Sequence, residues 1–184
     1  SAARFGRQNV AAGEADLKRA IELAPQNPLG YSRLAALRYT QKNYREAEKL
    51  FEQALGKDPN FAEAMQGLMS LYETQKQPAR ALARLEQQIA KSPNNAVYQF
   101  LKGGFMIRQD DLEKAQAAYE QAVALDKNYV DATLALAGVL SDRGQEDRAI
   151  ALFQQSIQQN PKDVRPYMLL ATLQERRKDW ARAK

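Results

Sequence analysis

Apolar residues recur every three or four positions along most of the chain, which is the spacing of an amphipathic helix. In residues 44–57, for example, Ala47, Leu50 and Phe51 fall on one face. No stretch alternates between apolar and polar residues for long enough to form a strand. The pattern therefore predicts an all-α fold, with helices over residues 10–23, 28–41, 44–57, 62–76, 78–91, 96–109, 112–126, 130–143, 146–160 and 164–178.

Residues at the helix ends support these boundaries. Pro28 and Pro78 suit a first helical turn, where no backbone N–H is needed. Asn43 can cap the helix that follows it, Glu46 completes a capping box, and Asp111 is a second expected cap. Every connection spans only a few residues, so consecutive helices are predicted to lie antiparallel.

Small side chains return every 34 residues, which identifies the helices as copies of one hairpin. Ala115 follows Ala81 and precedes Ala149 by 34 positions, and Gly103 precedes Ala137 by the same step. A period held without insertion indicates stacked copies of one unit. We therefore predict a single array over residues 1–184, with complete repeats at 28–61, 62–95, 96–129 and 130–163 and partial repeats at 1–27 and 164–184.

The two ends of this array are expected to be open. Residues 1–7 fit the end of a helix whose beginning lies outside the sequence, and Asp179 is expected to cap a new helix that starts at Trp180. An open end lacks the polar cap that a finished solenoid carries. Either end could therefore dock a second copy of the chain.

Aligned on the 34-residue period, the chain resembles the tetratricopeptide repeat family. Tyr31, Leu34, Ala35, Phe51 and Pro59 match the aromatic, leucine, small, aromatic and proline positions of its signature, and the match recurs in the later copies. The resemblance implies a right-handed α-solenoid, a superhelix of stacked antiparallel hairpins. Small positions let the helices approach closely; here they are Ala47, Ala54, Ala81, Gly103, Ala115, Ala122, Ala137, Ala149 and Ala171.

Three positions depart from the family signature. Met69 and Gln88 stand where small side chains are usual, so the repeat at 62–95 is expected to pack more loosely. Lys127 replaces the closing proline, which is expected to soften that turn slightly.

The resemblance also implies a function, because such arrays bind peptides or partner proteins in a groove lined by the first helix of each repeat. Chaperone-binding members use Lys, Arg and Asn side chains there as a clamp for two carboxylates. The corresponding positions here include Ser32, Ala36, Glu63 and Gln66, and no Asn lies in the groove. We therefore reject the carboxylate clamp for this chain.

A different groove is expected in the second half of the chain, with an apolar centre, basic residues beside it, and two glycines that leave room for a ligand backbone. A helix or extended segment with apolar anchors and an acidic flank would suit it. The alternative is that Phe100, Leu134 and Met168 pack between repeats. The candidate residues are Val97, Phe100, Gly104, Ile107, Arg108, Leu134, Gly138, Arg165, Met168 and Arg176.

The composition argues against catalysis. The chain has no Cys and no His, which removes thiol nucleophiles, histidine bases and most zinc or iron sites. Neighbouring acids such as Asp110 and Asp111 fit helix caps, and Gly103 and Gly104 lie within a helical pattern rather than in a phosphate-binding loop. We expect a non-catalytic protein without cofactor or metal, acting as an interaction scaffold.

Charge and hydropathy narrow the partners further. The net charge is +5, but basic residues form no run longer than the three at 176–178, so nucleic acid is not an expected partner. No apolar run is long enough for membrane insertion. The expected partner is a protein or peptide; the alternative is a spacer or self-assembly module within a larger protein. A cytoplasmic and a periplasmic location both fit, and the Gln- and Ala-rich composition is suggestive of bacteria.

Overall fold

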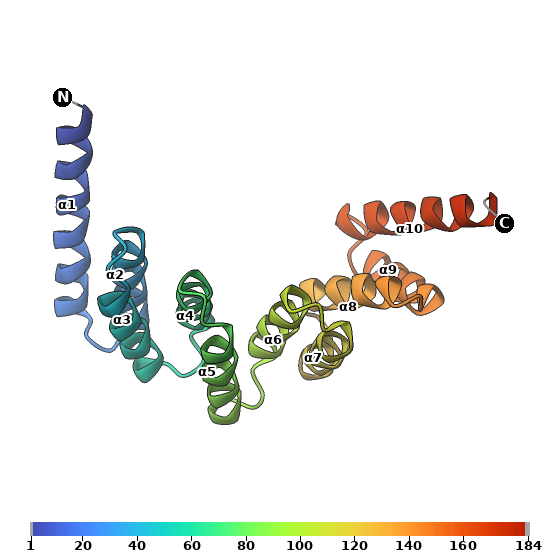
Figure 1. Cartoon of the computed structure of the whole chain (residues 1–184), viewed down its shortest axis with the longest axis horizontal. Helices are drawn as coiled ribbons and strands as arrows, with labels where there is room; N and C mark the ends of the chain where they lie inside the picture. The colour runs from blue at the N-terminus through green and yellow to red at the C-terminus, as the bar shows by residue number, and fades with distance from the viewer. Residues whose placement is uncertain (1, 183–184) are drawn as a thin grey trace. The chain divides into compact units, whose positions relative to one another are not determined.

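The structure is a computed structural model that describes the backbone of residues 2–182 and the side chains of residues 12–178. It contains two compact units, Ser1–Pro93 and Asn94–Lys184, and each is described by itself. No described residue lies in a strand, so the predicted all-α fold is confirmed. The first unit holds α1 (Ala2–Leu23), α2 (Pro28–Thr40), α3 (Tyr44–Lys57), α4 (Ala62–Thr74) and α5 (Pro78–Lys91) (Figure 1). The second holds α6 (Ala96–Arg108), α7 (Leu112–Leu125), α8 (Val130–Asp142), α9 (Glu146–Gln159) and α10 (Arg165–Arg182).

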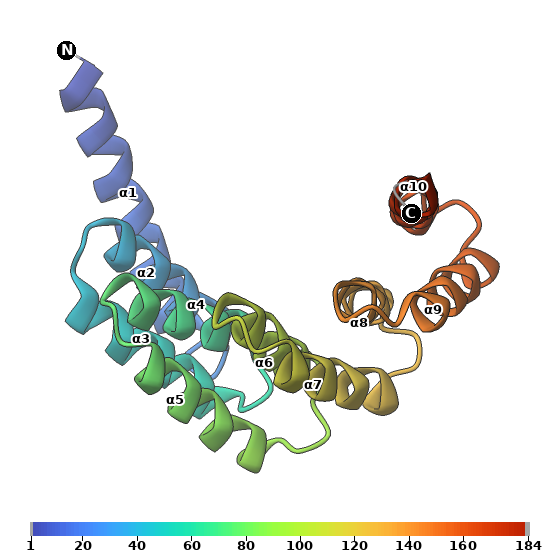
Figure 2. The same cartoon turned by 45° about the vertical axis from the view of Figure 1, so that its right-hand side comes forward.

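The helices pair in chain order as hairpins. The pairs are α2/α3 and α4/α5 in the first unit and α6/α7 and α8/α9 in the second, and Figures 1 and 2 show each pair side by side. In the first unit α1 packs on α2, and α3 packs on α4. In the second unit α7 packs on α8, and α10 packs on both α9 and α8. Stacked hairpins of this kind make each unit a piece of an α-solenoid.

One turn geometry closes all four hairpins. Lys42, Lys76, Asp110 and Gly144 have positive φ angles of 60°, 58°, 59° and 73°, and they follow one another at intervals of 34 residues. In each turn the next N–H donates to the carbonyl five residues earlier, as from Asn43. A left-handed residue with this backbone bond is a common way to end a helix. The period of the sequence is therefore also a period of the backbone.

The two terminal helices differ from the sequence prediction. A helix end within residues 1–7 is wrong, because α1 continues through them from Ala2, and Ser1 lies outside the described residues. A new helix at Trp180 capped by Asp179 is also wrong, because α10 runs without a break to Arg182; residues 183–184 lie outside the described residues.

The period explains the difference. Gln8 and Lys178 occupy the register position of Lys42, yet both lie inside helices. A left-handed conformation is costly for a side chain other than glycine. In a hairpin, packing between the two helices offsets this cost; α1 and α10 are single helices, for which continued helical hydrogen bonding is favoured.

Side-chain caps begin several helices as predicted. The Asn43 carbonyl oxygen accepts from the Glu46 N–H at 3.4 Å, and the Asp111 carboxylate accepts from the Lys114 N–H at 3.0 Å. The Glu46 carboxylate accepts from the Asn43 side-chain amide at 2.8 Å, which closes the box through side chains. The Lys114 ammonium and N–H both hydrogen-bond to Asp111 and lower the pKa of its carboxyl.

The small positions of the period form the contact surface of the hairpins. Eight of the nine predicted positions are buried in the structure, namely Ala47, Ala54, Ala81, Gly103, Ala115, Ala122, Ala137 and Ala149. The ninth, Ala171 on α10, is exposed, because no second helix of a hairpin covers this face of α10 in the described part of the chain.

The repeat that departs from the signature packs differently. Met69 and Gln88 are buried at 3% and 1% exposure, and the α4 and α5 backbones stay close over a shorter length than those of the other hairpins. This agrees with the expected looser packing. The Gln88 amide is satisfied because it donates to the Pro59 carbonyl at 2.6 Å and accepts from Arg84 at 2.9 Å. No helix among the described residues combines the length and the apolar character that crossing a membrane requires.

Candidate functional site

The predicted groove residues all lie in the second unit, on α6, α8 and α10, which are the first helices of their repeats. On α6, Phe100, Gly104, Ile107 and Arg108 share one face at helical spacing. Ile107 is 38% exposed and Arg108 is exposed, whereas Val97, Phe100 and Gly104 are half-buried.

The aromatic part of this site is a cluster around Phe100. Its ring centroid lies 5.6 Å from that of Tyr119 on α7 and 5.2 Å from that of Tyr129, which precedes α8. Both pairs are tilted, a favourable arrangement for aromatic rings. Phe100 therefore contributes to packing as well as to the surface.

The same register position is buried in α8 and exposed in α10. Leu134 is 8% exposed, so for this residue the structure favours the packing alternative. Met168, one period later, is 66% exposed and offers most of its side chain to solvent. Gly138 is half-buried, and a Cβ added to it would meet no atom within 4 Å.

Two of the predicted basic residues are paired with α8. The Arg165 guanidinium lies 2.6 Å from the Asp131 carboxylate and also binds Asp163, and both contacts raise the pKa of Arg165. Arg176 lies 3.6 Å from Asp142 and donates to the Ser141 hydroxyl. These bridges tie the two ends of the α8/α10 pair. Because their charges are balanced locally, they offer a weaker acidic-flank recognition site than the sequence suggests.

The remaining predicted residues meet at the two glycines of α6. A Cβ on Gly103 would lie 2.5 Å from the Tyr119 ring, so the ring rests where a side chain would be. A Cβ on Gly104 would lie 3.6 Å from the Tyr119 hydroxyl oxygen and 3.7 Å from an Arg108 nitrogen. The Arg108 guanidinium donates to the Gly104 carbonyl at 3.0 Å. Sequence reasoning placed Gly104 and Arg108 in the groove but missed Tyr119, which belongs to a second helix.

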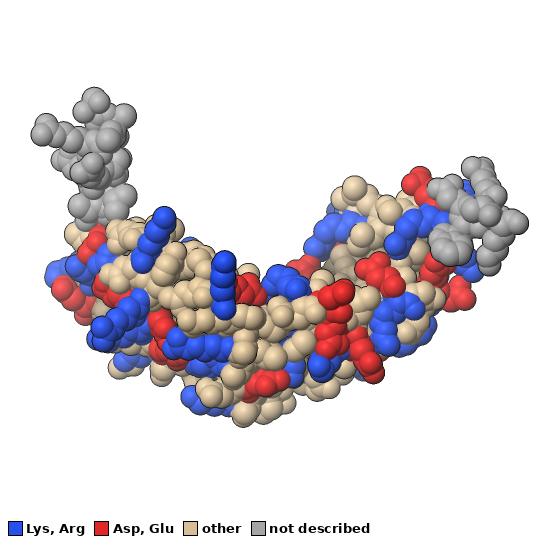
Figure 3. Space-filling view, in the orientation of Figure 1, with Lys and Arg blue, Asp and Glu red and all other residues tan. Residues whose placement is uncertain are grey.

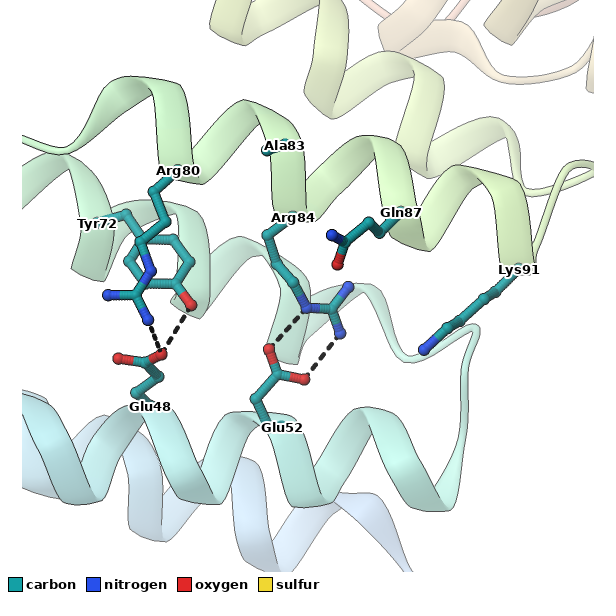
Figure 4. A pocket seen from close by; sticks show the side chains of 8 residues that line it. All are labelled: Glu48, Glu52, Tyr72, Arg80, Ala83, Arg84, Gln87 and Lys91. Carbon is teal, nitrogen blue, oxygen red and sulfur yellow. Dashed lines mark hydrogen bonds and ion pairs between the residues drawn. The ribbon is translucent and has the colours of Figure 1, made fainter.

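A polar cleft on the first unit was also missed. It has a volume of about 390 Å³ and lies between α3 and α5 (Figure 4). The Arg80 guanidinium lies 2.5 Å from the Glu48 carboxylate, and Arg84 binds Glu52 through two hydrogen bonds of 2.6 and 2.8 Å. The signal in the sequence is that each Glu precedes its Arg by 32 residues.

The charges of this cleft largely satisfy one another. Tyr72 donates to Glu48 at 3.0 Å, and burial together with this carboxylate raises the pKa of Tyr72 to about 12. An acidic ligand would have to displace Glu48 or Glu52 from an arginine. The cleft therefore fastens α3 to α5 across the hairpins, and the groove of the second unit is the better candidate site. Figure 3 shows basic and acidic side chains interspersed, without a large patch of one sign on the visible face.

Comparison with known families decides the classification. A tetratricopeptide repeat profile matches residues 38–103 and 106–173, and a second profile of the same description matches residues 2–62. The chain belongs to the tetratricopeptide repeat family. Tetratricopeptide repeat proteins are typically non-catalytic interaction scaffolds. The comparison with curated proteins returned no match.

Solved structures of tetratricopeptide repeat proteins share the fold. A thermophilic protein of Thermus thermophilus is 20% identical with a TM-score of 0.66, and the match covers 94% of each chain. YrrB is 18% identical with a TM-score of 0.58, over 90% of this chain and 85% of that one. Yeast Tom70 is 17% identical with a TM-score of 0.76, over 92% of this chain and 37% of that one.

Proposed function

We propose that this tetratricopeptide repeat chain is a non-catalytic scaffold that binds a peptide segment of a partner protein against the first helices of the second unit. The observation that carries the proposal is the exposure of two apolar side chains on those helices, Ile107 at 38% and Met168 at 66%. Exposed apolar side chains on a surface of first helices suit the anchors of a bound segment.

The surroundings of these anchors support a defined wall. The Arg165–Asp131 and Arg176–Asp142 bridges join α8 to α10 on either side of Met168. Between the bridges lie Gly138, half-buried without a side chain, and exposed Thr172. A segment can therefore approach the backbone of α8 closely between two fixed points.

The family and its structures support the class of function. One solved structure of the same fold, YrrB, is described as a protein with an unusual peptide-binding site. At 18% identity this likeness shows the fold alone, so peptide binding by the present chain is proposed on its own residues.

Self-assembly is a second candidate, favoured by apolar residues outside the groove. Val164, Tyr167 and Leu169, at the start of α10, are 65%, 45% and 41% exposed. An exposed apolar patch of this kind can join two copies of a chain. Its residues differ from Ile107 and Met168, so the two candidates can be separated by substitution.

The test is selection of random 12-residue peptides on the chain, followed by titration of enriched peptides against two double variants. Ile107→Ser with Met168→Ser removes the exposed anchors, and we expect peptide affinity to fall at least about tenfold. Val164→Ser with Leu169→Ser is the matched control, which removes two exposed apolar side chains elsewhere and leaves affinity unchanged. No enriched peptide, or an equal loss in both variants, contradicts the proposal. Dimerisation that only the control variant abolishes supports self-assembly instead.

A further inference from the structure

A small niche opens on α6 where Gly104 has no side chain. We define the Gly104 niche by Gly104, the guanidinium of Arg108 and the hydroxyl of Tyr119. Both polar groups lie within 4 Å of the point where a Cβ of Gly104 would stand, at 3.7 and 3.6 Å. Phe100 and Ile107 lie on the same face of α6, one turn before and one turn after the niche. Two hydrogen-bond donors therefore converge between two apolar side chains.

The Tyr119 hydroxyl is unusual among the tyrosines of this chain. The hydroxyls of Tyr31 and Tyr167 donate to backbone carbonyls, and that of Tyr72 donates to a carboxylate. Tyr119 is only 5% exposed, yet its hydroxyl makes no hydrogen bond to any residue that the structure describes. Its oxygen keeps contact with solvent at the niche, because it is absent from the fully buried polar atoms that lack a partner. A buried donor of this kind usually has a partner.

The Tyr119 side chain is held in place to present this donor. Its ring rests on Gly103, where a Cβ would lie 2.5 Å away, and stacks against Phe100 at 5.6 Å. Burial raises the pKa of the phenol above its usual value, so the hydroxyl keeps its proton at neutral pH. The niche thus offers a fixed neutral O–H donor beside a permanent positive charge.

We propose that the Gly104 niche receives the side-chain carboxylate of an Asp or Glu in the bound peptide, next to an apolar residue that contacts Phe100 and Ile107. A carboxylate accepts hydrogen bonds from both donors and matches the charge of Arg108. This inference rests on the proposed peptide-binding function and specifies the chemistry of the partner. It differs from a two-carboxylate clamp, because its defining donor is a tyrosine of a second helix.

The experiment uses the enriched 12-residue peptides and three single variants. Tyr119→Phe removes the hydroxyl and keeps the ring. Gly104→Ala places a methyl group in the niche at ordinary contact distances, so it fills the space without a clash. Gly138→Ala is the matched control, because this glycine has the same register position one repeat later and no atom within 4 Å of an added Cβ. Each variant is titrated with an acidic peptide and with the same peptide in which Asp or Glu is changed to the amide.

We expect Tyr119→Phe and Gly104→Ala each to weaken the acidic peptide about tenfold or more, the loss of a hydrogen bond to a charged group. The amide peptide binds the parent chain weakly and loses little further in either variant. Gly138→Ala binds both peptides like the parent. Thermal unfolding of Tyr119→Phe at or above the parent midpoint excludes a folding defect as the cause.

The outcomes separate this inference from the proposed function. Peptides that bind through Ile107 and Met168 but carry no enriched acid, or that ignore Tyr119→Phe and Gly104→Ala, overturn the niche and leave the function standing. Equal losses for the acidic and the amide peptide also overturn it, since the niche would then bind a neutral carbonyl. Failure to enrich any peptide overturns both.

Discussion

At the scale of residues, three glycines on equivalent helices have three different surroundings. A Cβ on Gly103 would strike the Tyr119 ring at 2.5 Å, one on Gly104 would touch two polar groups at 3.6 and 3.7 Å, and one on Gly138 would meet nothing within 4 Å. The sequence predicts that position 103 is small because it follows the period. It does not distinguish 104 from 138, because the difference is made by a tyrosine on another helix.

This difference gives a direct stability prediction. Gly103→Ala should lower the free energy of unfolding by about 1–3 kcal/mol, because the Tyr119 ring must move out of a packed site. Gly138→Ala should leave it unchanged or raise it by up to about 1 kcal/mol, because alanine favours the helix and nothing opposes it. Urea denaturation of both variants measures the effect. Equal effects of the two substitutions would contradict the described position of Tyr119.

Exposure at a shared register position could not be predicted in the same way. Leu134 and Met168 are both apolar and stand 34 residues apart, yet one is 8% and the other 66% exposed. Periodicity fixes which face a residue occupies. How much of that face is covered depends on the packing of neighbouring helices, which the sequence pattern alone does not give.

At the scale of elements, α1 is held to the first hairpin by a shared arginine. Arg38 of α2 is 8% exposed and binds the Glu14 carboxylate of α1 through two hydrogen bonds of 2.7 Å. It also lies 2.9 Å from the Glu46 carboxylate of α3. The Arg38 hydrogen bonds, followed by the one from Lys18, lower the pKa of Glu14 to about 2.

The attachment of α1 should therefore depend on pH. A carboxyl whose folded pKa is below its usual 4.5 contributes stability above that value and loses it as pH falls toward 2. Glu14→Gln should destabilise the chain at pH 7, and its difference from the parent should shrink between pH 4.5 and 2 in urea denaturation. Asp16→Asn, on the same helix, is the control, because Asp16 makes no ion pair with any described residue. A Glu14→Gln difference that stays constant or grows with acid would contradict this role.

Hairpin elements were predictable because their signals are local. Caps such as Asn43 and Asp111 and the 34-residue return of small side chains place the helices within a few residues. The terminal helices were mispredicted for the opposite reason. Whether the chain turns at Gln8 or Lys178 depends on a partner helix to pack against, and no local pattern reports that.

At the scale of the whole molecule, one period explains both the sequence and the backbone. The positive-φ residues Lys42, Lys76, Asp110 and Gly144 repeat at the same 34-residue step as the buried alanines. This repetition supports the family assignment and the α-solenoid fold. The single continuous array over residues 1–184 remains a prediction, since the two compact units are each described by themselves.

The partner is the part of the account that the sequence leaves open. Apolar and basic positions of the groove were predictable from the resemblance, but the Arg165 and Arg176 bridges and the Tyr119 donor depend on contacts between helices. These contacts shift the recognition chemistry from the ends of the groove to the Gly104 niche. A bound segment would show which chemistry is used.

The most direct test of peptide binding on the first helices is disulfide trapping. The chain has no Cys, so each engineered cysteine is unique. Thr172→Cys places a thiol on exposed α10 between the two bridges, and Gln155→Cys places one on the exposed side of α9. An enriched peptide carrying one terminal Cys should form a mixed disulfide with the first variant much faster than with the second. Equal trapping, or faster trapping at residue 155, would contradict binding in the proposed groove.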